Sequence, residues 1–208
     1  MLVVLVVLVM TDLTLLLFFC LVSADIREAW MADILAMPLN LQGWFMKYWS
    51  LLAIAGGVVG KISIGRLGRR TFTTMTNALT AVGFYIVSIP EAWASWLGYL
   101  IMLPGFNATH CAGMKAYATD LAVAHGIGRG EFAASIALLR GASVVVAPTI
   151  YSWLFGRQMS QGQTPRKAWW SVIVLGAILP EICHQLLTDD DLDVANVKSK
   201  KKKTEKRL

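Results

Sequence analysis

The sequence predicts an all-α fold, a polytopic membrane bundle of about six transmembrane helices. Hydrophobic residues make up 56% of the 208 residues and charged residues only 15%, and the mean hydropathy is +0.58. A soluble domain carries about 45–50% apolar and about 25% charged residues. Six apolar stretches also reach the roughly 20 residues that a helix needs to cross about 30 Å of hydrocarbon. The composition therefore argues against a water-soluble enzyme.

The six apolar stretches cover residues 2–22, 44–64, 72–89, 93–117, 132–155 and 168–187. We expect helices, because an isolated strand leaves its backbone unpaired in lipid and no barrel-like alternation is visible. A signal peptide is the alternative for the first stretch, since Val22-Ser23-Ala24 resembles a cleavage site. Against it, no base precedes the stretch and Asp12 interrupts it. A first residue that opens directly into the bilayer suggests that the chain begins inside a longer protein.

The charges are distributed unevenly along the chain. The net charge of +6 comes from the last eleven residues, which hold seven bases and one acid. A nucleic-acid-binding protein would spread its bases over a folded face, so we expect no nucleic-acid partner. We expect two regions, a transmembrane domain over residues 1–187 and a disordered charged tail over residues 188–208. The basic end of this tail could be held by anionic cytoplasmic lipid.

Bases in the short loops predict the orientation in the membrane. Thirteen bases fall on one side of the six stretches and five on the other, so both termini are expected in the cytoplasm. The loop from Arg157 to Lys167 runs against this assignment, because it places three bases on the outer side. Tryptophans near the outer ends of the stretches agree with an interfacial belt.

A basic motif follows the second stretch. Arg66-Leu67-Gly68-Arg69-Arg70 resembles the cytoplasmic loop motif of the major facilitator superfamily, Gly-x-x-x-Asp-Arg-x-Gly-Arg-Arg/Lys. The resemblance implies that Arg66, Gly68, Arg69 and Arg70 belong to a cytoplasmic gate. The family's Asp position is Gly65 here, so the helix-locking contact of that carboxylate is missing. A simple cluster of arginines that sets the topology is the alternative interpretation.

A second motif lies in the fifth stretch. The segment from Gly130-Glu131 to Pro148, followed by Tyr151 and Phe155, is similar to the eleventh helix of tetracycline-efflux-like facilitators. Together the two resemblances imply the carboxyl-terminal six-helix half of a twelve-helix carrier, built from two inverted three-helix units. They imply secondary transport of a small organic solute, with export by a proton-coupled antiporter as one form of it. The partner would be an amino-terminal six-helix half or a second copy.

Four residues inside the stretches are the candidates for the solute or proton pathway: Arg140, Asp12, Asn77 and His110. A charge at the position of Arg140 costs about 2.5–3.5 kcal/mol unless it faces protein or water. Arg140 either contacts solute or pairs structurally with Asp12 or Glu181. Asp12 either carries a coupling proton or is a polar residue at a displaced helix end.

Asn77 belongs to a polar stripe in the third stretch. Thr73, Asn77 and Thr80 recur at i, i+4 and i+7 and therefore share one helix face. Such a stripe lines a cavity or bonds to a neighbouring helix, and the second is commoner. In the fourth stretch Pro104-Gly105 predicts a break, with His110 just beyond it. The break is typical of either a pathway or packing around a kink.

Small residues four apart predict close helix packing, as at Gly56 and Gly60 and in the row from Ala133 to Gly141. The three cysteines are expected to be buried hydrophobes, because no metal-ligand spacing connects them. No motif indicates a metal, an organic cofactor or ATP. Besides a fragment of a carrier or a half that pairs with another, a membrane interaction protein that transports nothing stays open. An integral membrane enzyme would need an acid/base cluster that the sequence does not assemble.

Overall fold

The computed structural model describes residues 26–105, 115, 118–120, 122–123 and 126–186. No strand occurs among them, which confirms the all-α prediction. The first predicted stretch and the charged tail lie outside the described residues. The elements are η1 (Trp30–Ile34), α2 (Leu39–Leu67), α3 (Arg69–Val87), α4 (Ala92–Ile101), η2 (Leu103–Gly105), α6 (Arg129–Ser160), α7 (Arg166–Ile173), η4 (Val174–Ile178) and α8 (Leu179–Leu186).

The predicted stretches correspond to these helices. α2 and α6 contain the second and fifth stretches, α3 covers most of the third, and α7, η4 and α8 follow one another without a gap over the sixth. The fourth stretch changes character where it was predicted to, because α4 ends at Ile101 and a 3₁₀ turn holds Pro104 and Gly105. The ring of Pro104 and its missing N–H do not allow the α-helical ladder to continue.

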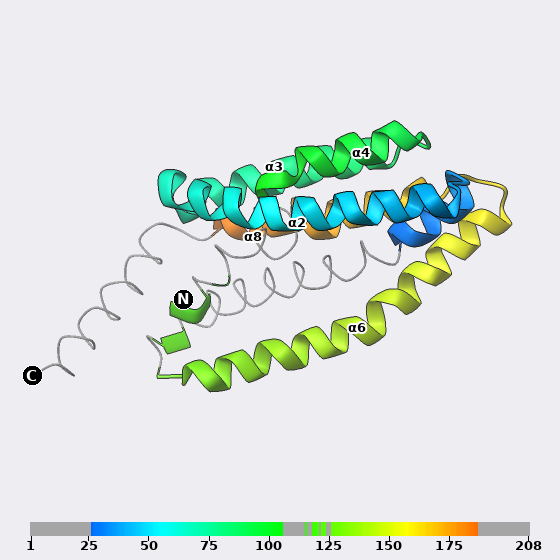
Figure 1. Cartoon of the computed structure of the whole chain (residues 1–208). Coiled ribbons are helices and arrows are strands. Elements are labelled where there is room, and N and C mark those ends of the chain that lie inside the picture. Colours follow the sequence, from blue (N-terminus) through cyan, green and yellow to red (C-terminus); the bar gives the residue numbers. More distant parts are fainter. Residues whose placement is uncertain (1–25, 106–114, 116–117, 121, 124–125, 187–208) are drawn as a thin grey trace, which may run out of the picture.

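α3 packs against α2, α4, α7, η4 and α8, and Figure 1 shows it beside α4. α6 makes its main contact with α7, and its amino-terminal half diverges from the other helices (Figure 1). The ribbon of α6 bends along its length, as expected for a helix with Pro148 in its interior.

Two glycines set the approach of α3 and α4. A Cβ placed on Gly98 would lie 2.5 Å from the carbonyl oxygen of Gly83 and 2.5 Å from Cγ2 of Val87. A Cβ on Gly83 would lie 2.8 Å from the carbonyl oxygen of Gly98. The two backbones therefore touch where only hydrogen fits, as in small-residue crossings of membrane helices.

The rows of small residues picked out in the sequence behave differently. Gly56 and Gly60 are buried on α2 as expected. On α6, no contact atom lies within 4 Å of a Cβ placed on Gly141. Ala133 and Ala137 are exposed as well. The close packing predicted for this second row is therefore absent from the part of the chain that the structure describes.

Aromatic side chains fill the end of the bundle near η1. Trp30 and Trp169 meet edge to face with their ring centroids 5.8 Å apart, and Phe84 stacks on Trp169 at 5.4 Å. Tyr99 meets Phe84 and Phe45 edge-on. These edge-on and stacked geometries are the favoured ones for aromatic pairs. We call these five residues the aromatic core.

One face of α2 is apolar and uncovered. Leu51, Ile54 and Val58 are each more than half exposed, whereas soluble monomers rarely present contiguous apolar patches larger than a few hundred Å². Among the described residues, α2 and the helical run Arg166–Leu186 are long and apolar enough to cross a membrane, judged by length and composition.

Candidate functional site

A π-helical turn shapes the helical run that carries the candidate site. Pro180 has no backbone N–H and cannot donate to the carbonyl four residues before it. The preceding turn, η4, is π-helical, and the N–H of Leu179 donates to the carbonyl oxygen of Val174, five residues back. Such turns add one residue to the ladder, which rotates the face presented after them, and they are frequent at functional sites. Beyond the turn, α8 packs against α3.

A carboxylate on α8 is bound by polar side chains from two helices. Asn77 Nδ2 donates to Glu181 Oε2 over 2.7 Å, and Thr74 Oγ1 donates to Glu181 Oε1 over 2.9 Å. Gln185 Nε2, one turn along α8, also donates to Glu181 Oε1. Two of the three donors come from α3, so the carboxylate links the two helices. We call these four residues the Glu181 cluster.

The burial of the Glu181 cluster is graded. Asn77 is buried, Thr74 and Glu181 are half-buried, and Gln185 is exposed. Asn77 Oδ1 has no hydrogen-bond partner. An amide oxygen left without a partner inside a protein is unfavourable by about 1–3 kcal/mol. The cluster therefore keeps one unused acceptor beside a carboxylate that is partly accessible.

Two threonines near Asn77 bond within α3. Thr73 Oγ1 donates to the carbonyl oxygen of Arg69 over 2.9 Å, and Thr76 Oγ1 donates to that of Thr73 over 3.0 Å. Asn77, a member of the predicted stripe, instead contacts another helix. This agrees with the interpretation in which a polar stripe bonds to a neighbouring helix.

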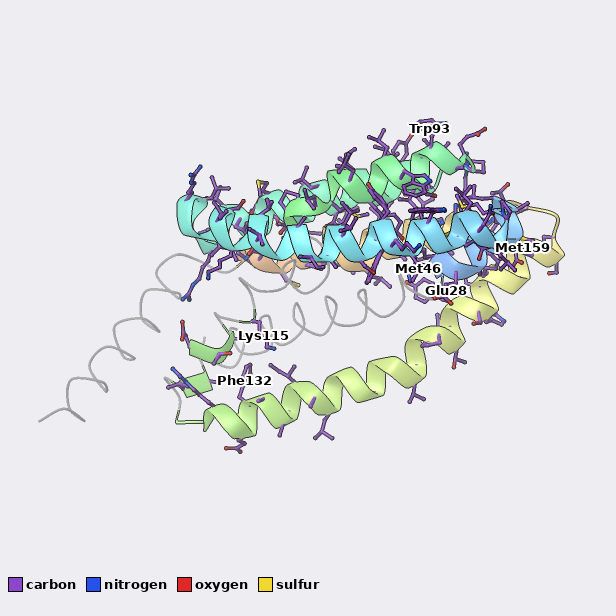
Figure 2. The ribbon with its side chains drawn as sticks, in the orientation of Figure 1. Glu28, Met46, Trp93, Lys115, Phe132 and Met159 are labelled. Carbon is purple, nitrogen blue, oxygen red and sulfur yellow. The ribbon has the colours of Figure 1, made fainter. Side chains whose placement is uncertain are left out.

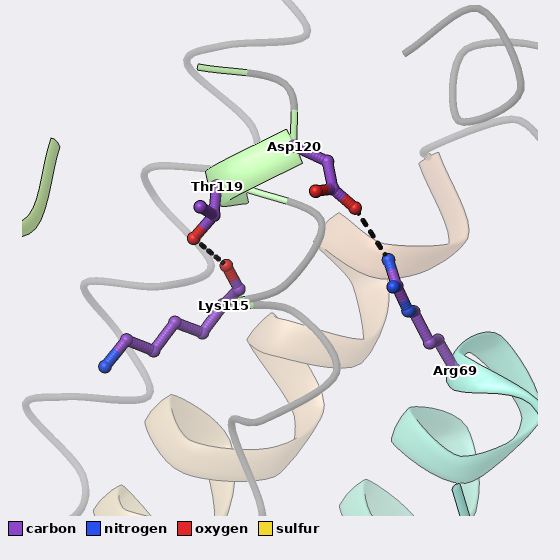
Figure 3. Close-up of polar contacts among 4 residues, drawn as sticks. All are labelled: Arg69, Lys115, Thr119 and Asp120. Atoms are coloured by element: carbon purple, nitrogen blue, oxygen red, sulfur yellow. Dashed lines mark hydrogen bonds and ion pairs between the residues drawn. The ribbon is translucent and has the colours of Figure 1, made fainter. Parts of the chain in front are cut away.

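The basic motif forms the turn between α2 and α3. Gly68 has φ 77° and ψ 167°, a conformation that essentially only glycine adopts. Arg69 Nη1 lies 2.9 Å from Asp120 Oδ2, and their side chains are 40% and 29% exposed (Figure 3). Close by, Thr119 Oγ1 donates to the carbonyl oxygen of Lys115. The motif thus has a carboxylate partner, although Gly65 supplies none.

The structure brings the predicted site residues together only in part. Asn77 lies in the Glu181 cluster, and Arg69 lies in the turn between α2 and α3 with Arg66, Gly68 and Arg70. The backbone of Arg140 lies on α6, but the structure does not describe its side chain. Asp12 and His110 are outside them as well, so the proposed pairing of Arg140 with Asp12 or Glu181 stays a prediction.

Sequence reasoning missed the hydrogen bonds of Glu181 with Thr74, Asn77 and Gln185, because it considered Glu181 only as a structural partner of Arg140. It also missed Thr74 and Asp120. One pattern points to the cluster, because Thr74 and Asn77 are three residues apart and Glu181 and Gln185 four apart, and both spacings place polar groups on one helix face. No pattern links Arg69 to Asp120, which lies 51 residues along the chain.

Comparisons with protein-family models, with curated proteins and with solved structures find no match for this chain.

Proposed function

We propose that this chain is a multi-pass membrane protein that acts as the carboxyl-terminal six-helix half of a facilitator-type carrier. It would move a small organic solute by secondary transport, with both termini in the cytoplasm. The Glu181 cluster would lie on the pathway of the solute or of a coupled proton. The basic motif with Asp120 would form the cytoplasmic gate.

The observation that carries this proposal is the position of Glu181. It belongs to a helical run that is long and apolar enough to cross a membrane, and its carboxylate accepts hydrogen bonds from two side chains of α3, Thr74 and Asn77. Ionisable groups inside membrane helices are rare, face the bundle interior and mark solute, ion or proton paths. Asn77, one of these donors, lies near the middle of α3.

The exposed face of α2 supports the membrane part of the proposal. Leu51, Ile54 and Val58 follow one another at helical spacing, and each exposes more than half of its surface. In water such a surface is unfavourable by about 25 cal/mol per Å² of apolar area, whereas lipid chains cover it without penalty.

The chemistry of the cluster suits a transient site better than a permanent lock. Glu181 can bind a proton, an ammonium group or a hydroxyl donor, and Gln185 on its exposed side leaves a route to it. A solute group that displaces Gln185 would contact the carboxylate while Asn77 and Thr74 keep it oriented. Release would restore the Gln185 contact, so binding and release exchange one hydrogen bond for another.

The full chain in proteoliposomes tests this proposal. Vesicles with an imposed proton gradient are offered radiolabelled organic cations, anions and zwitterions, and uptake is compared with that of protein-free vesicles. We expect saturable uptake that Glu181→Gln abolishes, because the amide cannot carry the charge. Glu91→Gln changes an exposed carboxylate in the loop before α4 and serves as the matched control, with uptake unchanged.

Crosslinking in the same vesicles separates a half that pairs with itself from one that does not. Uptake by a crosslinked dimer supports the half-carrier in which two copies assemble. If neither the dimer nor the chain combined with an amino-terminal half moves any solute, the alternative of a membrane interaction protein is favoured. Normal uptake by Glu181→Gln would remove the cluster from the pathway.

A further inference from the structure

A buried arginine lies at the end of the bundle opposite the basic motif. Arg27 precedes η1 and is 6% exposed, with its guanidinium carbon 4.7 Å from the centroid of the Trp49 ring. The carboxylate of Glu28, which is labelled in Figure 2, lies 3.7 Å away, but the Glu28 side chain is largely exposed and therefore a weak partner. Arg27 Nε has no hydrogen-bond partner. The positive charge is thus buried with incomplete compensation.

Two indole donors in the aromatic core are in the same situation. Trp30 is 1% exposed and Trp169 is fully buried, and neither Nε1–H has a hydrogen-bond partner. Their rings are in contact, with centroids 5.8 Å apart. Arg27 and Trp30 are three residues apart on a helical segment, so they are neighbours on its surface. Three unused donors, one of them cationic, therefore come from one small region.

Buried donors without acceptors are unfavourable, and a buried charge without a partner is more so. A region with several such buried donors, whose nearby carboxylate of Glu28 is largely exposed to solvent, is complementary to an anion. Aromatic rings beside it suit an apolar body attached to that anion. We propose that Arg27, Trp30 and Trp169 form a binding site for the carboxylate of an organic acid with an apolar body. This inference rests on the proposed function, because it names the class of solute.

The site is closed in this structure, since Trp30 and Trp169 are covered. The segment that carries Trp30 is followed by a strained residue, Ala36, with φ 45°, a left-handed conformation that alanine rarely adopts. Ala36 connects η1 to α2, so a change at this residue would move Arg27 and Trp30 together relative to Trp169. An opening that also relieves the backbone strain gives the anion a route to the donors.

α3 connects the surroundings of the new site to the Glu181 cluster. Phe84, which stacks on Trp169, lies two turns beyond Asn77 on α3, or about 10 Å at 1.5 Å per residue. The new site thus offers donors and a positive charge, and the Glu181 cluster offers a carboxylate. A solute with a carboxylate at one end and a donor group further along matches both.

Binding of radiolabelled phenylacetate to the purified full chain in detergent tests the inference. Phenylacetamide, which has the same shape but no charge, is the matched competitor. We expect phenylacetate to bind and phenylacetamide not to compete. Arg27→Gln should raise the Kd at least tenfold, since hydrogen bonds to charged groups are the strong ones. Trp30→Phe keeps an aromatic side chain, although a smaller one, and removes the N–H, and it should raise the Kd about fivefold.

Arg157→Gln is the matched control, because Arg157 also lies over an indole ring, 5.3 Å from the Trp153 centroid, but is exposed. Its Kd should equal that of the unchanged protein. Equal binding of phenylacetamide, or an unchanged Kd in both Arg27→Gln and Trp30→Phe, would overturn the inference. Trp30→Phe keeps the test decisive if Arg27→Gln does not fold.

An anionic lipid headgroup offers the same chemistry, and a second arm distinguishes it. Micelles containing phosphatidylglycerol are compared with micelles containing phosphatidylcholine, in the presence and absence of phenylacetate. Arg27-dependent binding of phosphatidylglycerol without binding of phenylacetate would overturn the assignment to a solute. Phenylacetate binding without uptake of any tested solute in proteoliposomes would contradict the proposed function and leave the anion site standing. Uptake of cations alone would support the proposed function and overturn the anion site.

Discussion

α2 and α3 are consecutive helices separated by one residue, Gly68, yet they are stabilised in different ways. α2 has 29 residues, of which only four are buried, and its outer face is apolar. α3 has 19 residues, of which eight are buried, and four of these are polar. α3 is therefore stabilised by specific neighbours, whereas much of the apolar surface of α2 is left uncovered by the described residues.

The largest effect is expected at the crossing of α3 and α4. Gly98→Leu would force a side chain into the carbonyl oxygen of Gly83, only 2.5 Å from the new Cβ. Because backbone cannot move aside cheaply, we expect a loss of about 3 kcal/mol or more, at the upper end for overpacking. Thermal unfolding of the detergent-purified protein measures this. Gly57→Leu on α2, where no contact atom lies within 4 Å, is the control and should be close to neutral.

A charge on the open face of α2 should have the next largest effect. Ile54→Lys places an ammonium group at a site that is 70% exposed. If lipid covers this face, insertion of the helix becomes less favourable by about 2.5–3.5 kcal/mol. A glycosylation-based insertion assay reports the change, with Ile54→Val as the conservative control. Unchanged insertion together with solubility in the absence of detergent would contradict the membrane assignment.

The Glu181 cluster is the specific contact on which α3 depends. Asn77→Leu removes a buried donor from a carboxylate, so we expect the unfolding free energy to fall by about 1–3 kcal/mol. When Glu181→Gln is already present, Asn77→Leu should lower the unfolding free energy by less, because the two residues interact directly and their effects are not additive. A double-mutant cycle measured by thermal unfolding gives the interaction energy. Strict additivity would show that the contact contributes nothing.

The contrast between the two helices explains how far the sequence could predict the structure. Hydropathy locates α2 and the run Arg166–Leu186, because a long helix of mostly apolar residues is visible in the sequence as an apolar stretch. The break at Pro104 follows from the proline itself. The contacts of α3 cannot be predicted from hydropathy or from a single residue, since they depend on which faces of neighbouring helices pack against α3.

The candidate site shows the same limit. Asn77 could be selected because a polar stripe on an apolar helix is visible in the sequence. Glu181 could not be recognised as its partner, because the π turn before it determines which way the carboxylate points. The donors of Arg27 and Trp30 were also beyond sequence reasoning, since their missing partners are a property of the packed structure.

The smallest effect is expected at the turn that joins the two helices. Arg69 and Asp120 are 2.9 Å apart but substantially exposed, so solvent screens their attraction. Arg69→Ala should lower the unfolding free energy by less than about 1 kcal/mol, and the loss should shrink further as salt rises from low to high concentration. Thermal unfolding at two salt concentrations measures it, with exposed Arg66→Ala as the control. An ion pair that contributes so little to the unfolding free energy can open and close readily. The proposed cytoplasmic gate requires such a pair, whereas a structural lock does not. A salt-insensitive loss of several kcal/mol would instead identify Arg69 as a structural lock between the two helices and the segment that carries Asp120.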